Sequence, residues 1–131
     1  MPLTLSLQFP TGRYVAASWG DKDEVEWPPH PARLCLALID VLHKSGNSPA
    51  HRVALQWLTK QDPPEIVIPI PQRADVRLLD GIYVPQNPAQ ADGVQHPRKP
   101  RSFPTVFLDA DTPTVFFQWP FAEVPPDLRE D

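Results

Sequence analysis

WPPHP, at Trp27–Pro31, divides the sequence into a strand-forming part and a helix-forming part. Proline disfavours helical backbone in the residue before it, so the chain is expected to stay extended up to Pro31. The fixed φ angle of Pro31 suits the first position of a helix, with His30 as the N-cap. The run therefore predicts that a helix begins at Pro31.

Before this run, apolar and polar residues alternate at the start of the chain. Leu3, Leu5, Leu7 and Phe9 occupy every second position, which is typical of a strand with one buried face. The following Pro10-Thr11-Gly12 is expected to end or kink the strand, because proline donates no ladder hydrogen bond and glycine permits a turn. The segment 13–19 is expected to continue as a bent strand or a loop.

After the run, the spacing of apolar residues predicts two helices. The first should end near Ser45-Gly46, where glycine can adopt the left-handed cap. The second begins well at Ser48-Pro49, a side-chain N-cap followed by proline, and is stopped by Asp62-Pro63-Pro64. Its apolar positions follow helical spacing, as do those of the first helix: Leu34, Leu38, Val41 and Leu42.

The second half of the sequence consists of short apolar runs separated by prolines. Residues 65–70 predict an edge strand, and 76–84 predicts one arm of a projecting hairpin. Residues 85–104 are expected to form a long loop, and such loops are usually functional or disordered. Two strands, 105–110 and 114–119, are expected to pair as a hairpin around Asp111-Thr112-Pro113. Residues 125–131 have the pattern of an uncompleted helix start.

Composition favours one α+β domain over residues 1–131 with a modest core, since 41% of the 131 residues are hydrophobic. Neither a signal-peptide pattern nor a membrane-length apolar stretch is visible, so we expect a cytoplasmic protein without a membrane partner. The net charge of −4 argues against coating nucleic acid by bulk attraction. A local basic patch remains compatible with that charge, because residues 94–104 contain three cations and no acid.

Motifs for common chemistry are missing. The sequence has no glycine-rich phosphate loop, no CxxC and no HExxH, and its four histidines are isolated, so no metal and no cofactor are predicted. Cys35 is expected to be a core thiol, because it lies in an apolar helical run and buried free cysteine behaves as a small hydrophobe. We therefore expect a protein that is not an enzyme.

Cations alternate with aromatic residues in two places, as they do in single-stranded nucleic-acid sites. Arg13-Tyr14 is followed by Trp19, and Tyr83 precedes the basic segment with Arg98, Lys99 and Arg101. The pattern predicts binding of an anionic ligand with planar rings.

Five segments, in order, resemble the N-terminal part of the Csb-two family. They are residues 2–14 (PLTLSLQFPTGRY), Trp19-Gly20, residues 26–34 (EWPPHPARL), residues 106–110 (VFLDA) and Trp119-Pro120. Csb-two proteins are CRISPR-associated proteins of type I-G (formerly I-U) systems, fusions of a Cas-five half and a Cas-six half. The resemblance implies a RAMP-type, ferredoxin-like RNA-recognition fold, with an antiparallel sheet, helices on one face and a projecting hairpin or long loop, apparently incomplete at the C-terminus.

The same resemblance implies a subunit that holds the 5′ handle of a CRISPR RNA within a Cascade surveillance complex. Its partners would be the CRISPR RNA, the Cas-seven-type backbone and large subunits and, through the complex, target DNA. Residues 71–104 would form the RNA-contacting thumb. No Cas-six half is present in these 131 residues, so RNA processing is not expected. The candidate RNA-binding residues are Arg13, Tyr14, Trp19, Arg33, Arg73, Arg77, Tyr83, His96, Arg98, Lys99 and Arg101.

Two other functions stay open on the sequence alone. One is a metal-independent RNA endonuclease in which His30 or His96 acts in general acid–base cleavage near neutral pH. The other is a protein-interaction module, unrelated to RNA, that uses its proline-rich loops as a binding surface.

Overall fold

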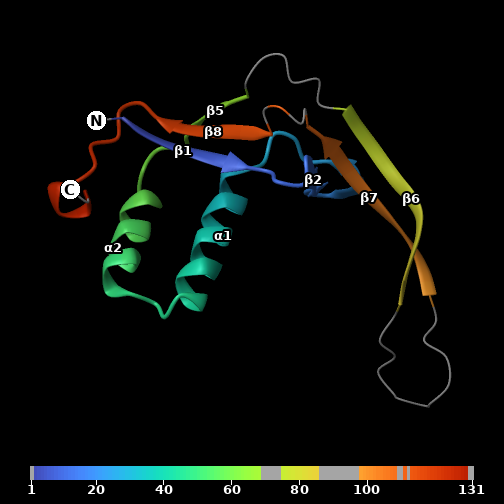
Figure 1. The fold of residues 1–131 in the computed structure, drawn as a ribbon, viewed down its shortest axis with the longest axis horizontal. Helices are drawn as coiled ribbons and strands as arrows, with labels where there is room; N and C mark the ends of the chain where they lie inside the picture. Colours follow the sequence, from blue (N-terminus) through green and yellow to red (C-terminus); the bar gives the residue numbers. More distant parts are fainter. Residues whose placement is uncertain (1, 69–74, 86–97, 109–110, 112, 130–131) are drawn as a thin grey trace, which may run out of the picture.

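The computed structural model describes residues 2–68, 75–85, 98–108, 111 and 113–129. It confirms an α+β protein with antiparallel sheets and two helices (Figure 1). One three-stranded sheet has the order β1 (Leu3–Gln8), β8 (Thr114–Trp119), β5 (Glu65–Val67). A second has the order β2 (Arg13–Val15), β7 (Arg98–Phe107), β6 (Asp75–Pro85), and β3 (Ala17–Ser18) pairs with β4 (Asp21–Val25).

The core lies between the first sheet and the two helices, α1 (Pro31–Lys44) and α2 (Pro49–Leu58). Both helices lie on the same face of that sheet (Figure 1). Phe117 and Val115 of β8 are fully buried, and Leu34 of α1 and Leu58 of α2 pack with them. The predicted alternating strand is confirmed in β1, because half-buried and exposed residues alternate along it.

Both helices begin where the proline pattern predicts. His30 caps α1, since its Nδ1 accepts a hydrogen bond from the backbone N–H of Ala32 at 3.1 Å. Ser48 is the N-cap residue of α2, with no side-chain capping bond. Cys35 lies partly buried on α1, so the expectation of a core thiol is wrong. The neighbouring Leu36 is 63% exposed, which shows that this side of α1 turns away from the sheet.

A shared bend links the two three-stranded sheets. β1 continues through a turn at Gly12 (φ 66°) into β2, and β7 leads to β8 across from it. The bend is held by the N–H of Phe9 donating to the carbonyl of Pro113 and the N–H of Leu108 donating to that of Gly12, both at 2.8 Å. The predicted hairpin of 105–110 with 114–119 is therefore wrong. Its two strands lie in different sheets, because the chain changes sheet at this corner.

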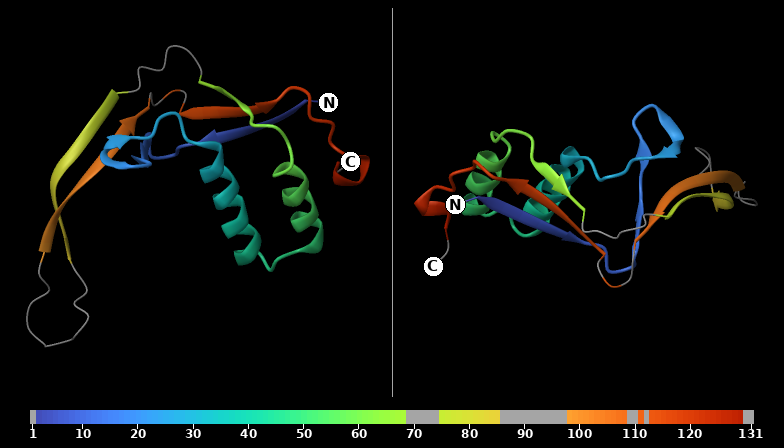
Figure 2. Two further views of the ribbon diagram at one scale, coloured as in Figure 1. Left: turned by 180° about the vertical axis from the view of Figure 1, so that it is seen from behind. Right: turned by 90° about the horizontal axis from the view of Figure 1, so that it is seen from above.

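β6 and β7 form a long ribbon that projects from the rest of the molecule (Figures 1 and 2). The ribbon confirms one predicted arm, 76–84, but the loop predicted for 85–104 is wrong at its end, since 98–104 belongs to β7. Pro100 and Pro104 made this segment look unlike a strand. They are tolerated because β2 pairs only with residues 105–107, which leaves one side of β7 open beside both prolines.

The remaining described elements are short. β5 is an edge strand, as predicted, although it ends at Val67. A 3-10 turn at Pro126–Leu128 agrees with the predicted incomplete helix start. The acidic strand β4 was not predicted, because four of its five residues are charged and such residues are depleted in strands. Neither described helix has the length and apolar character that crossing a membrane requires.

Candidate nucleic-acid interface

The register of the second sheet places four cations on one face. Cross-strand partners share a face of a sheet, and successive residues of a strand alternate between faces. Arg13 is opposite Phe107, Arg77 is opposite Thr105, Arg101 is opposite Ile82 and Lys99 is opposite Val84. All four β7 positions are odd-numbered, so these rows lie on the same face. The basic face is defined as Arg13, Arg77, Lys99 and Arg101.

A bulge in β6 preserves this arrangement along the ribbon. Between the pairs Leu79–Phe103 and Ile82–Arg101, β6 has one residue more than β7. The extra residue accompanies Gly81, whose φ of 72° is favourable only for glycine among common residues. Without it, Ile82 and Val84 would lie on the opposite face from their present partners. Since β7 continues without interruption, Lys99 and Arg101 stay on the face of Arg13 and Arg77.

The basic face is open to solvent. Its four cations are exposed, and Val15, which shares the row of Arg77, is 51% exposed. On the opposite face Val106 is fully buried. The rows from Lys99 to Phe107 extend about 26 Å, at about 3.3 Å per residue of strand. This length suits a nucleic-acid backbone that lies along the ribbon.

Arg77 has a defined position on this face. Its guanidinium carbon lies 5.5 Å from the centre of the Phe107 ring, a cation–π contact. The contact agrees with the register, since Arg77 and Phe107 occupy diagonal positions on one face. A planar guanidinium held over a ring is well placed to contact phosphate.

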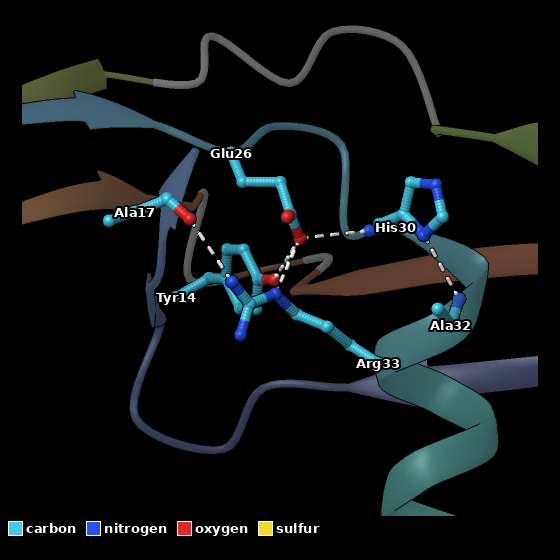
Figure 3. Close-up of polar contacts among 6 residues, drawn as sticks. All are labelled: Tyr14, Ala17, Glu26, His30, Ala32 and Arg33. Carbon is cyan, nitrogen blue, oxygen red and sulfur yellow. Dashed lines mark hydrogen bonds and ion pairs between the residues drawn. The ribbon is translucent and has the colours of Figure 1, made fainter. Parts of the chain in front are cut away.

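Behind the ribbon, a polar cluster joins β2 to the start of α1 (Figure 3). Oε1 of Glu26 accepts hydrogen bonds from the Tyr14 hydroxyl at 3.2 Å, the His30 backbone N–H at 3.2 Å and the Arg33 Nε at 2.6 Å. The Arg33 guanidinium also donates to the carbonyl of Ala17 at 3.1 Å. One carboxylate therefore fixes WPPHP against β2 and β3.

The electrostatics of this cluster follow from those contacts. Burial works to raise the pKa of Glu26, but hydrogen bonds from Arg33, His30 and Tyr14 outweigh it and lower that pKa. Burial, with the charge of Glu26 beside it, raises the pKa of Tyr14 to about 12. The ring of Tyr14 packs edge-on against Phe9, with centroids 5.5 Å apart, and lies 5.9 Å from that of Trp27. Tyr14 and Arg33 are thus engaged in holding the fold together.

We expect Tyr14 to ionise late in a spectroscopic titration. The chain has two tyrosines, so the Tyr83→Phe variant leaves Tyr14 as the only one. Its absorbance of tyrosinate should rise with a midpoint at about pH 12. Because the pKa is raised in the folded state, the contribution of Tyr14 to stability is present below its ordinary pKa of about 10 and lost as pH rises towards 12. A midpoint near the ordinary value would show that Glu26 and the packed rings do not surround Tyr14.

The other predicted site residues are distributed between several surfaces. Tyr83 and Arg98 are exposed, but their register partners Pro100 and Pro85 place them on the face opposite Lys99 and Arg101. Trp19 is 99% exposed in the turn between β3 and β4. Arg73 and His96 lie outside the described residues. The predicted set is therefore brought together only in part.

Sequence reasoning missed Glu26 and the Arg77–Phe107 contact. Glu26 lies next to WPPHP and seven residues before Arg33, which was a usable signal for an ion pair across the start of the helix. The Arg77 contact depends on the register of β6 with β7, which the prolines concealed. Among the residues that the structure describes, no group of three or more His, Cys, Asp or Glu side chains is placed to hold a metal ion.

Comparisons with known proteins add no relative: no protein-family model, no curated protein and no solved structure gives a significant match to this chain.

Proposed function

We propose that this protein is a non-catalytic subunit that binds single-stranded RNA along the basic face of the β6–β7 ribbon. The observation that carries the proposal is the position of Arg13, Arg77, Lys99 and Arg101 on one exposed face, in a protein of net charge −4. Lys and Arg contacts to phosphates supply affinity without reading sequence. A ribbon that projects from the molecule presents these groups without obstruction from the helices.

The resemblance to the Csb-two family adds the identity of the RNA to the proposal. The RNA is the 5′ handle of a CRISPR RNA, and the protein is a Cas-five-like subunit of a type I-G Cascade complex, in contact with its backbone and large subunits. The ribbon, within 71–104, corresponds to the thumb. The sheet β1-β8-β5 with both helices on one face supports a ferredoxin-like, RAMP-type unit, which is likewise part of the proposal.

The basic face makes a prediction that separates local contacts from bulk charge. The double variant Lys99→Gln/Arg101→Gln removes two cations from that face. Binding to a single-stranded RNA that carries a CRISPR repeat should weaken at least about tenfold, and the slope of log affinity against log salt should fall by about 1.4, since each lost phosphate contact contributes about 0.7. Electrophoretic mobility shift over a salt series measures both.

The matched control is Arg52→Gln/Arg98→Gln, which changes the net charge equally. Arg52 lies on α2, and Arg98 lies on the opposite face of the ribbon. The control should bind like the unchanged protein. Equal losses in both variants would mean attraction by overall charge, and no binding by any variant would end the proposal. Specific cleavage of the RNA in these gels would support the endonuclease alternative instead.

A further inference from the structure

β1 is an unprotected sheet edge. Within the described part of the chain it pairs with β8 on one side and has no strand on the other. Proteins usually guard such edges with charges, prolines, bulges or short length. The edge strand β6 has Asp75, Arg77 and a bulge, and β5 has only three residues. β1 has six residues, LTLSLQ, without a charge, a proline or an irregularity.

An apolar cavity opens beside this edge. Its volume is about 460 Å³, within the range of small binding sites. Leu3 and Leu5 of β1 line it, together with side chains of α1, α2 and the C-terminal segment, whereas β8 and β5 contribute nothing to its lining. Val41 on its α1 side is 58% exposed. The free edge and the exposed apolar surface therefore occur at the same place.

We propose that a second copy of this chain pairs with β1 through its own β1, in antiparallel orientation. The resulting sheet would have six strands, with the two β1 strands in the centre. A two-fold axis perpendicular to the sheet brings the strands together antiparallel and keeps both helical layers on one face. The apolar row Leu3, Leu5 and Leu7 then meets its own copy on the helix side.

The chemistry of β1 fits this occupant. A strand that pairs with itself places identical side chains near one another, so any charge on it would be repelled by its copy. β1 has no charge, and its exposed row, Thr4, Ser6 and Gln8, consists of groups that hydrogen-bond to one another. The same symmetry places the two apolar cavities on the same face on either side of the axis, where each is shielded by the partner's helices. This surface lies away from the basic face, so the proposal is independent of RNA binding.

Sedimentation velocity of the full chain over micromolar concentrations tests the pairing. We expect a dimer for the unchanged protein and a monomer for Thr4→Lys/Ser6→Lys, because both positions are exposed in the monomer and would oppose like charges across the axis. The variant Thr4→Glu/Ser6→Glu should also be monomeric. Mixing the two variants should restore a dimer of one copy of each, which would also show that both variants are folded.

The control Gln56→Lys/Thr59→Lys adds the same charge at exposed positions near the end of α2 and should stay dimeric. A monomeric unchanged protein at every concentration would overturn the proposal. So would a dimer that survives in the lysine variant, or a mixture of lysine and glutamate variants that stays monomeric although circular dichroism shows both to be folded.

Discussion

Replacing Phe117 with alanine should lower the free energy of unfolding by about 3–5 kcal/mol, the usual cost of removing a buried phenylalanine. Phe117 is fully buried at the centre of the middle strand β8. Its register partners are Leu5 of β1 and Ile66 of β5, so its side chain joins both neighbouring strands to the helices. The truncation leaves a cavity that three elements would have to move to fill. Urea unfolding followed by circular dichroism measures the change.

The control is Phe121→Ala, which removes the same ring from a position that is 93% exposed. Its effect should stay within about 0.5 kcal/mol, as for most surface substitutions. Because small domains have only about 5–15 kcal/mol of stability, the Phe117 variant is expected to be close to unfolding at physiological temperature. Equal effects of the two substitutions would mean that the core is not centred on β8.

The sequence predicts the elements around this core because local patterns determine them. The alternation in Leu3–Gln8 and the proline-initiated helices at Pro31 and Pro49 need no knowledge of the rest of the chain. The corner at 108–113 is different. Asp111-Thr112-Pro113 has the composition of a hairpin turn, and only the pairing of β7 with β2 and of β8 with β1 shows that it joins two sheets.

The candidate site was predictable as composition and not as geometry. The absence of acids from 94–104 correctly drew attention to Lys99 and Arg101. Their placement with Arg13 and Arg77, and the separation of Arg98 from them, depends on strand parity across the Gly81 bulge. Parity requires knowing that 98–104 is a strand, which its prolines disguise. Tyr14 illustrates the opposite error, since a cation–aromatic pair in the sequence is held by Glu26 and two rings in the structure.

The Glu26→Ala substitution should destabilise the fold by about 2 kcal/mol at neutral pH, within the 1.5–3 kcal/mol typical of hydrogen bonds to charged groups. Three donors lose their acceptor at once: the Tyr14 hydroxyl, the His30 N–H and the Arg33 guanidinium. The side chain of Glu26 is 20% exposed, so water replaces it poorly, while that of Arg33 is 48% exposed and can be partly rehydrated. This balance places the expected effect below that of Phe117→Ala.

The effect of removing the charge at Glu26 should depend on pH in a definite direction. Hydrogen bonds from Arg33, His30 and Tyr14 overcome burial and lower the pKa of Glu26 in the folded protein, so the carboxylate contributes stability above its ordinary pKa of about 4.3. That contribution is lost as pH falls through the folded pKa. The difference in unfolding free energy between the unchanged protein and Glu26→Gln should therefore be largest near neutral pH and vanish in acid. The exposed Glu24→Gln is the control and should show no such dependence. A constant difference for Glu26→Gln at all pH values would mean that its shape, and not its charge, holds WPPHP against β2.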